Sequence, residues 1–118
     1  MAEQQQQQKK DGNEYLLILP DKEGSLQTRL KVRDEHLLRA KTLTENGTWI
    51  FGGAMLSHHP TPSETGPPPM EGSVLVAVGA SEEAVMGVIR EDAYVKAGVW
   101  DLEKVRCIPF RVAIQKGK

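Results

Sequence analysis

The histidine at position 36 is the residue of this sequence best placed to do chemistry. It lies in VRDEHLLRAKTL, residues 32–43, which has the pattern of an amphipathic helix. Val32, Ala40 and Leu43 share its helical face, so His36 occupies a position where the helical period predicts an apolar side chain. It is therefore either a core histidine held by a hydrogen-bond partner or a base that moves a proton.

A candidate partner for His36 lies in REDAYVKAGVWD, residues 90–101, where a second helix is expected to end near Asp92 and Tyr94. If the two helices run side by side on one face of a sheet, the Asp92 carboxylate can approach the imidazole. A carboxylate holds a histidine in one tautomer and makes it a better base. Arg33, one turn before His36, offers a planar guanidinium that could hold a carboxylate.

The remaining chemical groups give weaker signals. His58 and His59 are adjacent, so their side chains diverge, and no CxxC, HxH or HExxH spacing completes a metal site. No G-x-G-x-x-G or P-loop occurs, so we expect neither a metal nor a nucleotide cofactor. Ser73 could offer a hydroxyl to a ligand. The single cysteine, Cys107, lies in an apolar run and is expected to be a core residue rather than a nucleophile.

Six elements are expected to position these residues. Strands are predicted at residues 15–19, 48–55, 72–80 and 103–114, and helices at residues 26–45, capped by Ser25, and from Ser81 toward Asp92. This order predicts an α+β fold of the ferredoxin-like βαββαβ type, in which a four-stranded antiparallel sheet carries both helices on one face. The third strand is apolar on both faces, so we expect the face without helices to be covered in a homodimer.

Three local features refine this scheme. The pairs Gly52-Gly53 and Gly72-Ser73 are expected at strand ends, and Pro109 should place the last strand at a sheet edge or a bulge. Residues 56–72 hold five of the seven prolines and are expected to form a long loop, of the kind that acts as a lid or binding loop. The aromatic residues Trp49, Phe51 and Trp100 are expected in the core or an interface.

Length and composition limit the domain organisation and the partners. At 118 residues the chain has room for one domain, expected at residues 14–115 after a disordered, glutamine-rich tail at residues 1–13. The net charge of -1 gives no field strong enough to hold nucleic acid or an anionic membrane. No apolar stretch is long enough for a membrane span, and residues 1–20 lack the apolar region of a signal peptide. We therefore expect a cytoplasmic protein.

Several short motifs occur in order between Tyr15 and Ile114. They are R-x-x-H-L at Arg33, His36 and Leu37, the glycine pair of the second strand, G-S at Gly72 and Ser73, D-x-Y-x-x-A-G-V from Asp92 to Val99, and P-F at Pro109 and Phe110. Together they resemble the YCII-like family of the dimeric ferredoxin-like (α+β barrel) superfamily, although this chain has Ala93 where family members commonly have proline. The resemblance implies that His36 and Asp92 form an active-site dyad. It also implies cofactor-free proton removal from small cyclic or phenolic compounds, because related proteins include a dehydrochlorinase of a chlorinated hydroxyquinol and muconolactone isomerases.

We therefore expect a small homodimeric lyase or isomerase (a dehydratase, dehydrohalogenase or isomerase) of secondary metabolism that acts on a small oxygenated cyclic or aromatic substrate. His36, oriented by Asp92, would remove the proton, and Arg33 or Tyr94 would hold the developing oxyanion. Three further residues are expected to contact the substrate: Ser73, His58 and His59. One alternative is a non-catalytic protein of the same fold that binds or carries a metabolite. A purely structural protein, the second alternative, would have no enclosed cavity near His36.

Overall fold

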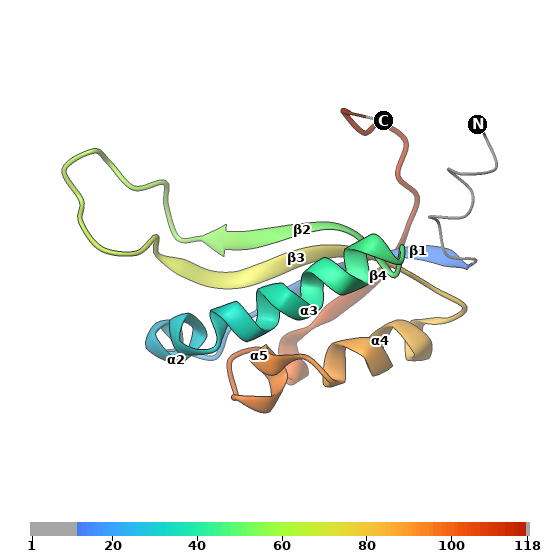
Figure 1. Ribbon diagram of the computed structural model, residues 1–118, viewed down its shortest axis with the longest axis horizontal. Coiled ribbons are helices and arrows are strands. Elements are labelled where there is room, and N and C mark those ends of the chain that lie inside the picture. The colour runs from blue at the N-terminus through green and yellow to red at the C-terminus, as the bar shows by residue number, and fades with distance from the viewer. Residues whose placement is uncertain (1–11, 118) are drawn as a thin grey trace.

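The structure, a computed structural model, describes residues 12–117 as a four-stranded sheet with its helices on one face (Figure 1). The strands are β1 (Asn13–Pro20), β2 (Trp49–Leu56), β3 (Met70–Gly79) and β4 (Arg106–Phe110). The helices are α2 (Leu26–Lys31), α3 (Arg33–Glu45), α4 (Glu82–Arg90), α5 (Ala93–Lys96) and the 3-10 turn η1 (Leu102–Lys104). The strand order is β2-β3-β1-β4 with antiparallel neighbours, which confirms the predicted ferredoxin-like α+β fold.

The core lies between the sheet and the helices. Alternate residues of β1 (Tyr15, Leu17 and Leu19) are buried toward the helices, as the two-residue period of a strand requires. Side chains from β2, β3, α4 and the segment after α5 complete this layer: Trp49, Leu75, Ala77, Val85, Ile89 and Trp100. The two tryptophans are therefore core residues, as predicted. On the opposite face of β3, Val76 and Val78 are buried as well.

The first helical region corrects the prediction of one helix over residues 26–45. It is divided at Val32, whose backbone angles (φ -103°, ψ 10°) lie outside the regular helix, into α2 and α3. A β-branched residue has a reduced helix propensity, which favours a break there. Ser25 occupies the predicted N-cap position of α2, but its side chain makes no capping hydrogen bond. Arg29 of α2 and His36 of α3, on either side of the break, line the same pocket.

The second helical region begins as predicted and ends earlier. Ser81 caps α4, since its Oγ accepts a hydrogen bond of 3.1 Å from the Ala84 N–H. The helix stops at Arg90, so Asp92 is not in its last turn. Instead Asp92 has extended backbone angles and caps the short helix α5.

The last strand is shorter than the predicted residues 103–114. Only Arg106–Phe110 pairs with β1, and residues 102–104 form the turn η1. β4 is an edge strand, as the proline at position 109 predicted. Cys107 is partly buried against the core, and burial raises the pKa of its thiol. Both observations agree with the prediction of a core residue rather than a nucleophile.

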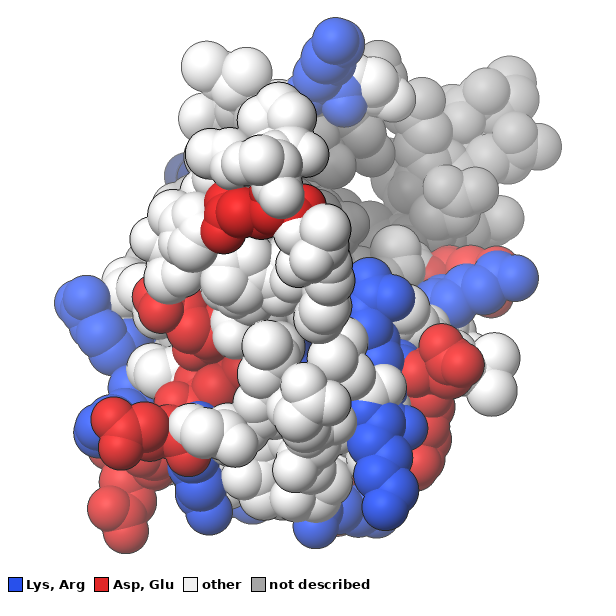
Figure 2. All heavy atoms as spheres, turned by 90° about the vertical axis from the view of Figure 1, so that its left-hand side faces the viewer, with Lys and Arg blue, Asp and Glu red and all other residues white. Residues whose placement is uncertain are grey.

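The connection between β2 and β3 is a hairpin whose loop is shorter than predicted. Met70 pairs with Leu56, so the loop covers residues 57–69 rather than 56–72. It is internally bonded: Glu64 accepts hydrogen bonds from the Thr61 N–H (2.6 Å) and lies 2.9 Å from His58 Nε2. The loop projects from one end of the molecule (Figure 1), and the view onto that end shows mostly uncharged residues with acidic side chains among them (Figure 2).

The glycines predicted at strand ends lie inside strands. Gly52 and Gly53 are in the middle of β2, opposite Leu75 and Val74, and Gly72 is within β3. A side chain on Gly52 would meet the Leu75 side chain and the Val74 carbonyl oxygen, whereas Gly53 has open space around it. β2 therefore presents no side chain toward α3 at Gly52.

Two expectations concern the ends of the chain and the membrane. The glutamine-rich tail predicted for residues 1–13 lies almost wholly outside the described residues, and Asn13 already belongs to β1. Within residues 12–117, no helix is long and apolar enough to cross a membrane.

Candidate active site

The centre of the site is the contact between His36 and Asp92. Nδ1 of the imidazole lies 2.7 Å from Oδ2 of the carboxylate, although the residues are 56 positions apart. Both are buried, with 8% of His36 and none of Asp92 exposed. Ala93, the first residue of α5, therefore leaves Asp92 within reach of His36 without the proline of the family.

Asp92 accepts hydrogen bonds from three donors. Besides His36, the Tyr94 N–H donates to Oδ2 at 3.0 Å, and Nη1 of Arg39 donates to Oδ1 at 3.2 Å. The other terminal nitrogen of Arg39 donates to the Val88 carbonyl at 2.9 Å, which ties α3 to the end of α4. A buried carboxylate is stable only when it is hydrogen-bonded in this way. The arrangement fixes the carboxylate and, through it, the imidazole.

The hydrogen bond to Asp92 determines which imidazole nitrogen is available. Because the carboxylate accepts at Oδ2, we assign the proton of the neutral ring to Nδ1, which leaves the lone pair on Nε2. Nε2 has no protein hydrogen-bond partner within residues 12–117. The ring is also held by aromatic contacts, stacked on Tyr94 with centroids 4.0 Å apart and edge-on to Trp100 at 5.6 Å. His36 is thus a fixed base with one free nitrogen.

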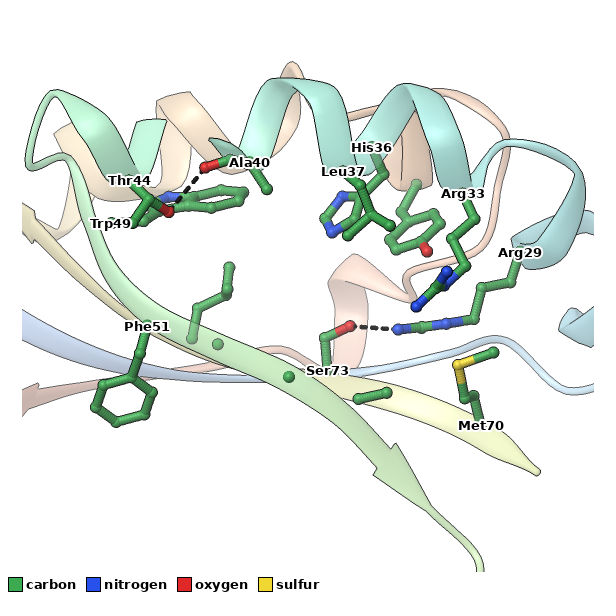
Figure 3. Close-up of a pocket in the computed structure, with 15 residues that line it drawn as sticks. Arg29, Arg33, His36, Leu37, Ala40, Thr44, Trp49, Phe51, Met70 and Ser73 are labelled. Carbon is green, nitrogen blue, oxygen red and sulfur yellow. Dashed lines mark hydrogen bonds between the residues drawn. The ribbon is translucent and has the colours of Figure 1, made fainter. Parts of the chain in front are cut away.

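A pocket of about 310 Å³ lies beside His36, between α3 and the strands β2 and β3. Figure 3 shows the His36 ring pointing from α3 into this space, with Arg29 and Arg33 at one end and Trp49 at the other. Gly52 and Gly53 line the pocket from β2, and Gly52, which pairs with the core residue Leu75, is the one whose missing side chain faces the helices. A partly open pocket beside a titratable group is typical of a small-molecule site. A pocket at this position weighs against the purely structural alternative, which predicts no enclosed cavity near His36.

A second polar cluster lies at the arginine end of the pocket. Nη1 of Arg29 donates to both carboxylate oxygens of Asp21, at 2.9 and 3.1 Å, and Nη2 donates to Ser73 Oγ at 2.8 Å. The guanidinium carbon lies 4.5 Å from the centroid of the Tyr94 ring. Ser73 Oγ also accepts from Trp100 Nε1 at 3.2 Å. The guanidinium is therefore held from several sides.

Burial changes the protonation of two groups in this region. It raises the pKa of Tyr94 above its ordinary value of 10.0; the cations Arg29 and Arg33 oppose this shift, and Asp92 adds to it. Burial also raises the pKa of Asp21, which Arg29 opposes. Tyr94 is therefore a neutral phenol at neutral pH.

The structure brings together five of the seven residues predicted for the site. Four of them line the pocket, and the fifth, Asp92, lies behind His36: Arg33, His36, Ser73, Tyr94 and Asp92. His58 and His59 are exposed in the 57–69 loop and do not line this pocket. Within residues 12–117, no three His, Cys, Asp or Glu residues lie together as a metal site would require.

Two arginines of the site were not predicted. Arg29 and Arg39 lie on helices, where an arginine is usually solvated, and only contacts with residues distant in sequence reveal their roles. The spacing of Arg29 seven positions before His36, two helical turns, was the one available signal. This spacing was a weak signal because an exposed arginine on the same helix can have it as well.

The fold and the site define a small α+β protein with a buried histidine and carboxylate beside a ligand-sized pocket. The chain belongs to the family described as the YCII-related domain, whose model matches residues 13–111. Fusaric acid biosynthesis protein 2 of Gibberella fujikuroi is 35% identical over 99 residues, which cover 83% of this chain and 92% of that protein. Other fungal relatives are likewise named for biosynthesis clusters.

Two further comparisons differ in coverage. Aspartate kinase FUB3 of Fusarium oxysporum f. sp. lycopersici is 34% identical over 106 residues, or 89% of this chain, but these cover 19% of that protein. A solved structure, 5-chloro-2-hydroxyhydroquinone dehydrochlorinase (TftG) from Burkholderia phenoliruptrix in complex with 2,5-dihydroxybenzoquinone, has a TM-score of 0.64 and 27% identity. That match covers 87% of this chain and 96% of the dehydrochlorinase.

Proposed function

We propose that this protein is a lyase or isomerase of fungal-type secondary metabolism that removes a proton from a small oxygenated cyclic or aromatic metabolite without a cofactor. The observation that carries the proposal is the buried 2.7 Å contact of His36 Nδ1 with Asp92, beside a pocket of about 310 Å³. The carboxylate stabilises the imidazolium that forms when Nε2 accepts a proton. His36 is therefore the general base, and Asp92 orients it.

In a lyase reaction, the electron pair left on the substrate would form a new double bond as a leaving group departs. In an isomerase reaction, the pair would move to an oxygen as an enolate and then take up a proton at another carbon. Lyase and isomerase chemistry share the first step, and in both the charge that develops on oxygen needs donors. Arg33 and the neutral phenol of Tyr94 line the same pocket and supply them. The imidazolium then returns the proton to the product or to water.

The comparisons support the substrate class. TftG, which matches nearly the whole chain, is a dehydrochlorinase of a chlorinated hydroxyhydroquinone and binds a dihydroxybenzoquinone. The relatives named for fusaric acid and xenovulene A biosynthesis favour a substrate from such a pathway. The absence of a side chain at Gly52 leaves the β2 wall of the pocket flat, which favours a planar ring as ligand.

We further propose that the protein acts as a homodimer through the sheet face opposite the helices. Apolar residues of all four strands lie on that face, among them Phe51 and Phe110, which are 48% and 41% exposed. A patch of this kind on a small protein marks an interface. Sedimentation of the full chain, compared with a Phe51→Lys variant, tests this: a dimer that dissociates in the variant supports it, and a wild-type monomer contradicts it.

The catalytic proposal is tested by deuterium uptake. Hydroxylated quinones and phenols, including 2,5-dihydroxybenzoquinone, are incubated in deuterated buffer, and ring-proton exchange is followed by NMR for wild type, His36→Gln, Asp92→Asn and Arg90→Ala. Arg90 is an exposed arginine outside the pocket and serves as the control. We expect exchange above the buffer rate in wild type and in Arg90→Ala, and a loss of about 100-fold or more in His36→Gln.

The alternative is a non-catalytic protein that binds or carries such a metabolite. It predicts that ligands bind and are recovered unchanged, with no exchange above the buffer rate. Binding that needs His36 without any exchange would therefore replace the catalytic proposal by the binding one.

A further inference from the structure

The arginine end of the pocket presents hydrogen-bond donors that no protein atom satisfies. Arg29 is buried, with 3% exposed, and its Nε–H has no partner within residues 12–117. Nη2 of the same planar guanidinium is held by Ser73. A buried N–H that lacks an acceptor destabilises the fold, so its retention beside a pocket points to a ligand acceptor.

Ser73 supplies a second unsatisfied donor. Its Oγ already accepts from Arg29 Nη2 and from Trp100 Nε1, which fills both lone pairs of the hydroxyl. The hydroxyl hydrogen is then left to donate, and the described residues offer it no acceptor. Ser73 is 3% exposed and lines the pocket, so this donor is also directed to a ligand.

The charge at this end of the pocket is positive. Asp21 offsets Arg29, but both of its oxygens are bound by Nη1 and it does not line the pocket. Arg33 adds a second guanidinium at the same end (Figure 3) and has no carboxylate partner within the described part of the chain. Donors and positive charge without an acceptor are complementary to an anionic oxygen.

We propose that Arg29 and Ser73, assisted by Arg33, form an anion subsite that binds a carboxylate or phenolate oxygen of the ligand. The fork of Arg29 and the hydroxyl of Ser73 would donate to that oxygen, and the ring of the ligand would extend along the pocket toward His36. This deepens the proposed function by naming its substrates as ring compounds with an ionised oxygen. The claim that these compounds are substrates rests on the proposed function, in which His36 is the base. The anion subsite itself does not depend on His36.

Two pairs of ligands of equal shape test the subsite. One pair is 2,5-dihydroxybenzoate and 2,5-dihydroxybenzamide, and the other is 4-nitrophenolate, at a pH where it is ionised, and 4-nitroaniline. Calorimetric or NMR titration of the full chain should show the charged member of one or both pairs binding about tenfold more tightly than the neutral member. The pair that shows the preference tells carboxylate from phenolate. Equal affinity within both pairs would overturn the proposal.

Variants assign the preference to these residues. Arg29→Lys keeps the charge beside Asp21 but removes the fork, and Ser73→Ala removes the hydroxyl with a small truncation, so that either variant can serve if the other does not fold. Each should reduce the preference about tenfold, whereas Arg90→Ala should keep it. A folded Arg29→Lys or Ser73→Ala protein with the wild-type preference contradicts the subsite.

His36→Ala separates this proposal from the catalytic one. The anion preference should survive in that variant, because the subsite does not use the imidazole. If exchange requires His36 while neither ligand pair shows a preference, the subsite is wrong and the general base stands. If the preference is present but no exchange occurs, the subsite stands without the base.

Discussion

Nδ1 of His36 lies 2.7 Å from the carboxylate of Asp92, and this contact joins the first half of the chain to the second inside the core. It depends on two backbone features. The break at Val32 sets the position of α3, and the extended backbone at Asp92 turns its side chain back from the start of α5. The contact is therefore made between the first turn of α3 and the residue that caps α5.

Replacement of Asp92 by asparagine should destabilise the fold. The amide nitrogen cannot accept the bond from Arg39 or His36, and one partner of a buried network is left unpaired. We expect a loss of about 3 kcal/mol in the free energy of unfolding, measured by urea denaturation.

Asp101→Asn is the matched control for that experiment. Asp101 also caps a short helical turn, with Oδ1 accepting from the Glu103 N–H at 3.1 Å, but it has no imidazole partner. Asparagine caps as well as aspartate, so the change should stay within about 0.5 kcal/mol. Equal losses in the two variants would mean that Asp92 matters only as a helix cap.

The two serines predicted as helix caps should differ in their effect on stability. Ser81→Ala removes the bond to the Ala84 N–H and should cost about 1 kcal/mol. Ser25→Ala removes no capping bond and should stay within about 0.5 kcal/mol. Thermal or urea unfolding of both variants measures this, and a larger loss for Ser25→Ala would contradict the assigned caps.

The sequence predicted the elements well and the helix break poorly. Binary pattern and turn residues identify β1, α4 and the edge position of β4, because strand and helix periods leave a direct mark. Val32 gives only a small propensity signal within an otherwise good helix pattern. The true start of β3 depended on the pairing of Met70 with Leu56, a contact between distant residues that no local pattern contains.

The site was predictable where the helical period applies. His36 stands out because a polar residue occupies the apolar face of a helix, and Asp92 follows once the helices are placed side by side. The roles of Arg29 and Arg39 could not be predicted, since their partners Ser73 and Asp92 come from other elements. His58 and His59 attracted interest by type alone, and the hairpin carries them away from the pocket.

Adjacent glycines of β2 should respond differently to alanine. A Cβ on Gly52 would overlap Leu75 Cδ2 and lie 3.0 Å from the Val74 oxygen, so the Leu75 side chain must shift in the pocket. Gly52→Ala should cost about 1–3 kcal/mol of stability and weaken ligand binding. Gly53→Ala meets no atom within 4 Å and should resemble wild type in both measurements. A larger loss of stability and binding in Gly53→Ala than in Gly52→Ala would contradict the assignment of Gly52 to the pocket wall.

Tyr94 should ionise late in an alkaline titration. Burial raises its pKa above 10.0, so the folded state favours the phenol. Its contribution to stability is fully present below the pKa of the unfolded chain and is lost as the pH rises through the higher folded value. Subtracting the spectrum of Tyr94→Phe from that of wild type isolates the phenolate absorbance of Tyr94. This absorbance should therefore develop above pH 10. A difference spectrum complete at or below that pH in the folded protein would contradict the burial of this hydroxyl.

The most direct test of the central claim is chemical rescue of His36→Ala by imidazole. The substitution removes the base but leaves space for imidazole beside Asp92. We predict that ring-proton exchange of the substrate falls about 100-fold or more and is partly restored by added imidazole, in proportion to its free-base concentration. Wild-type exchange in folded His36→Ala without imidazole would contradict the claim that His36 is the base.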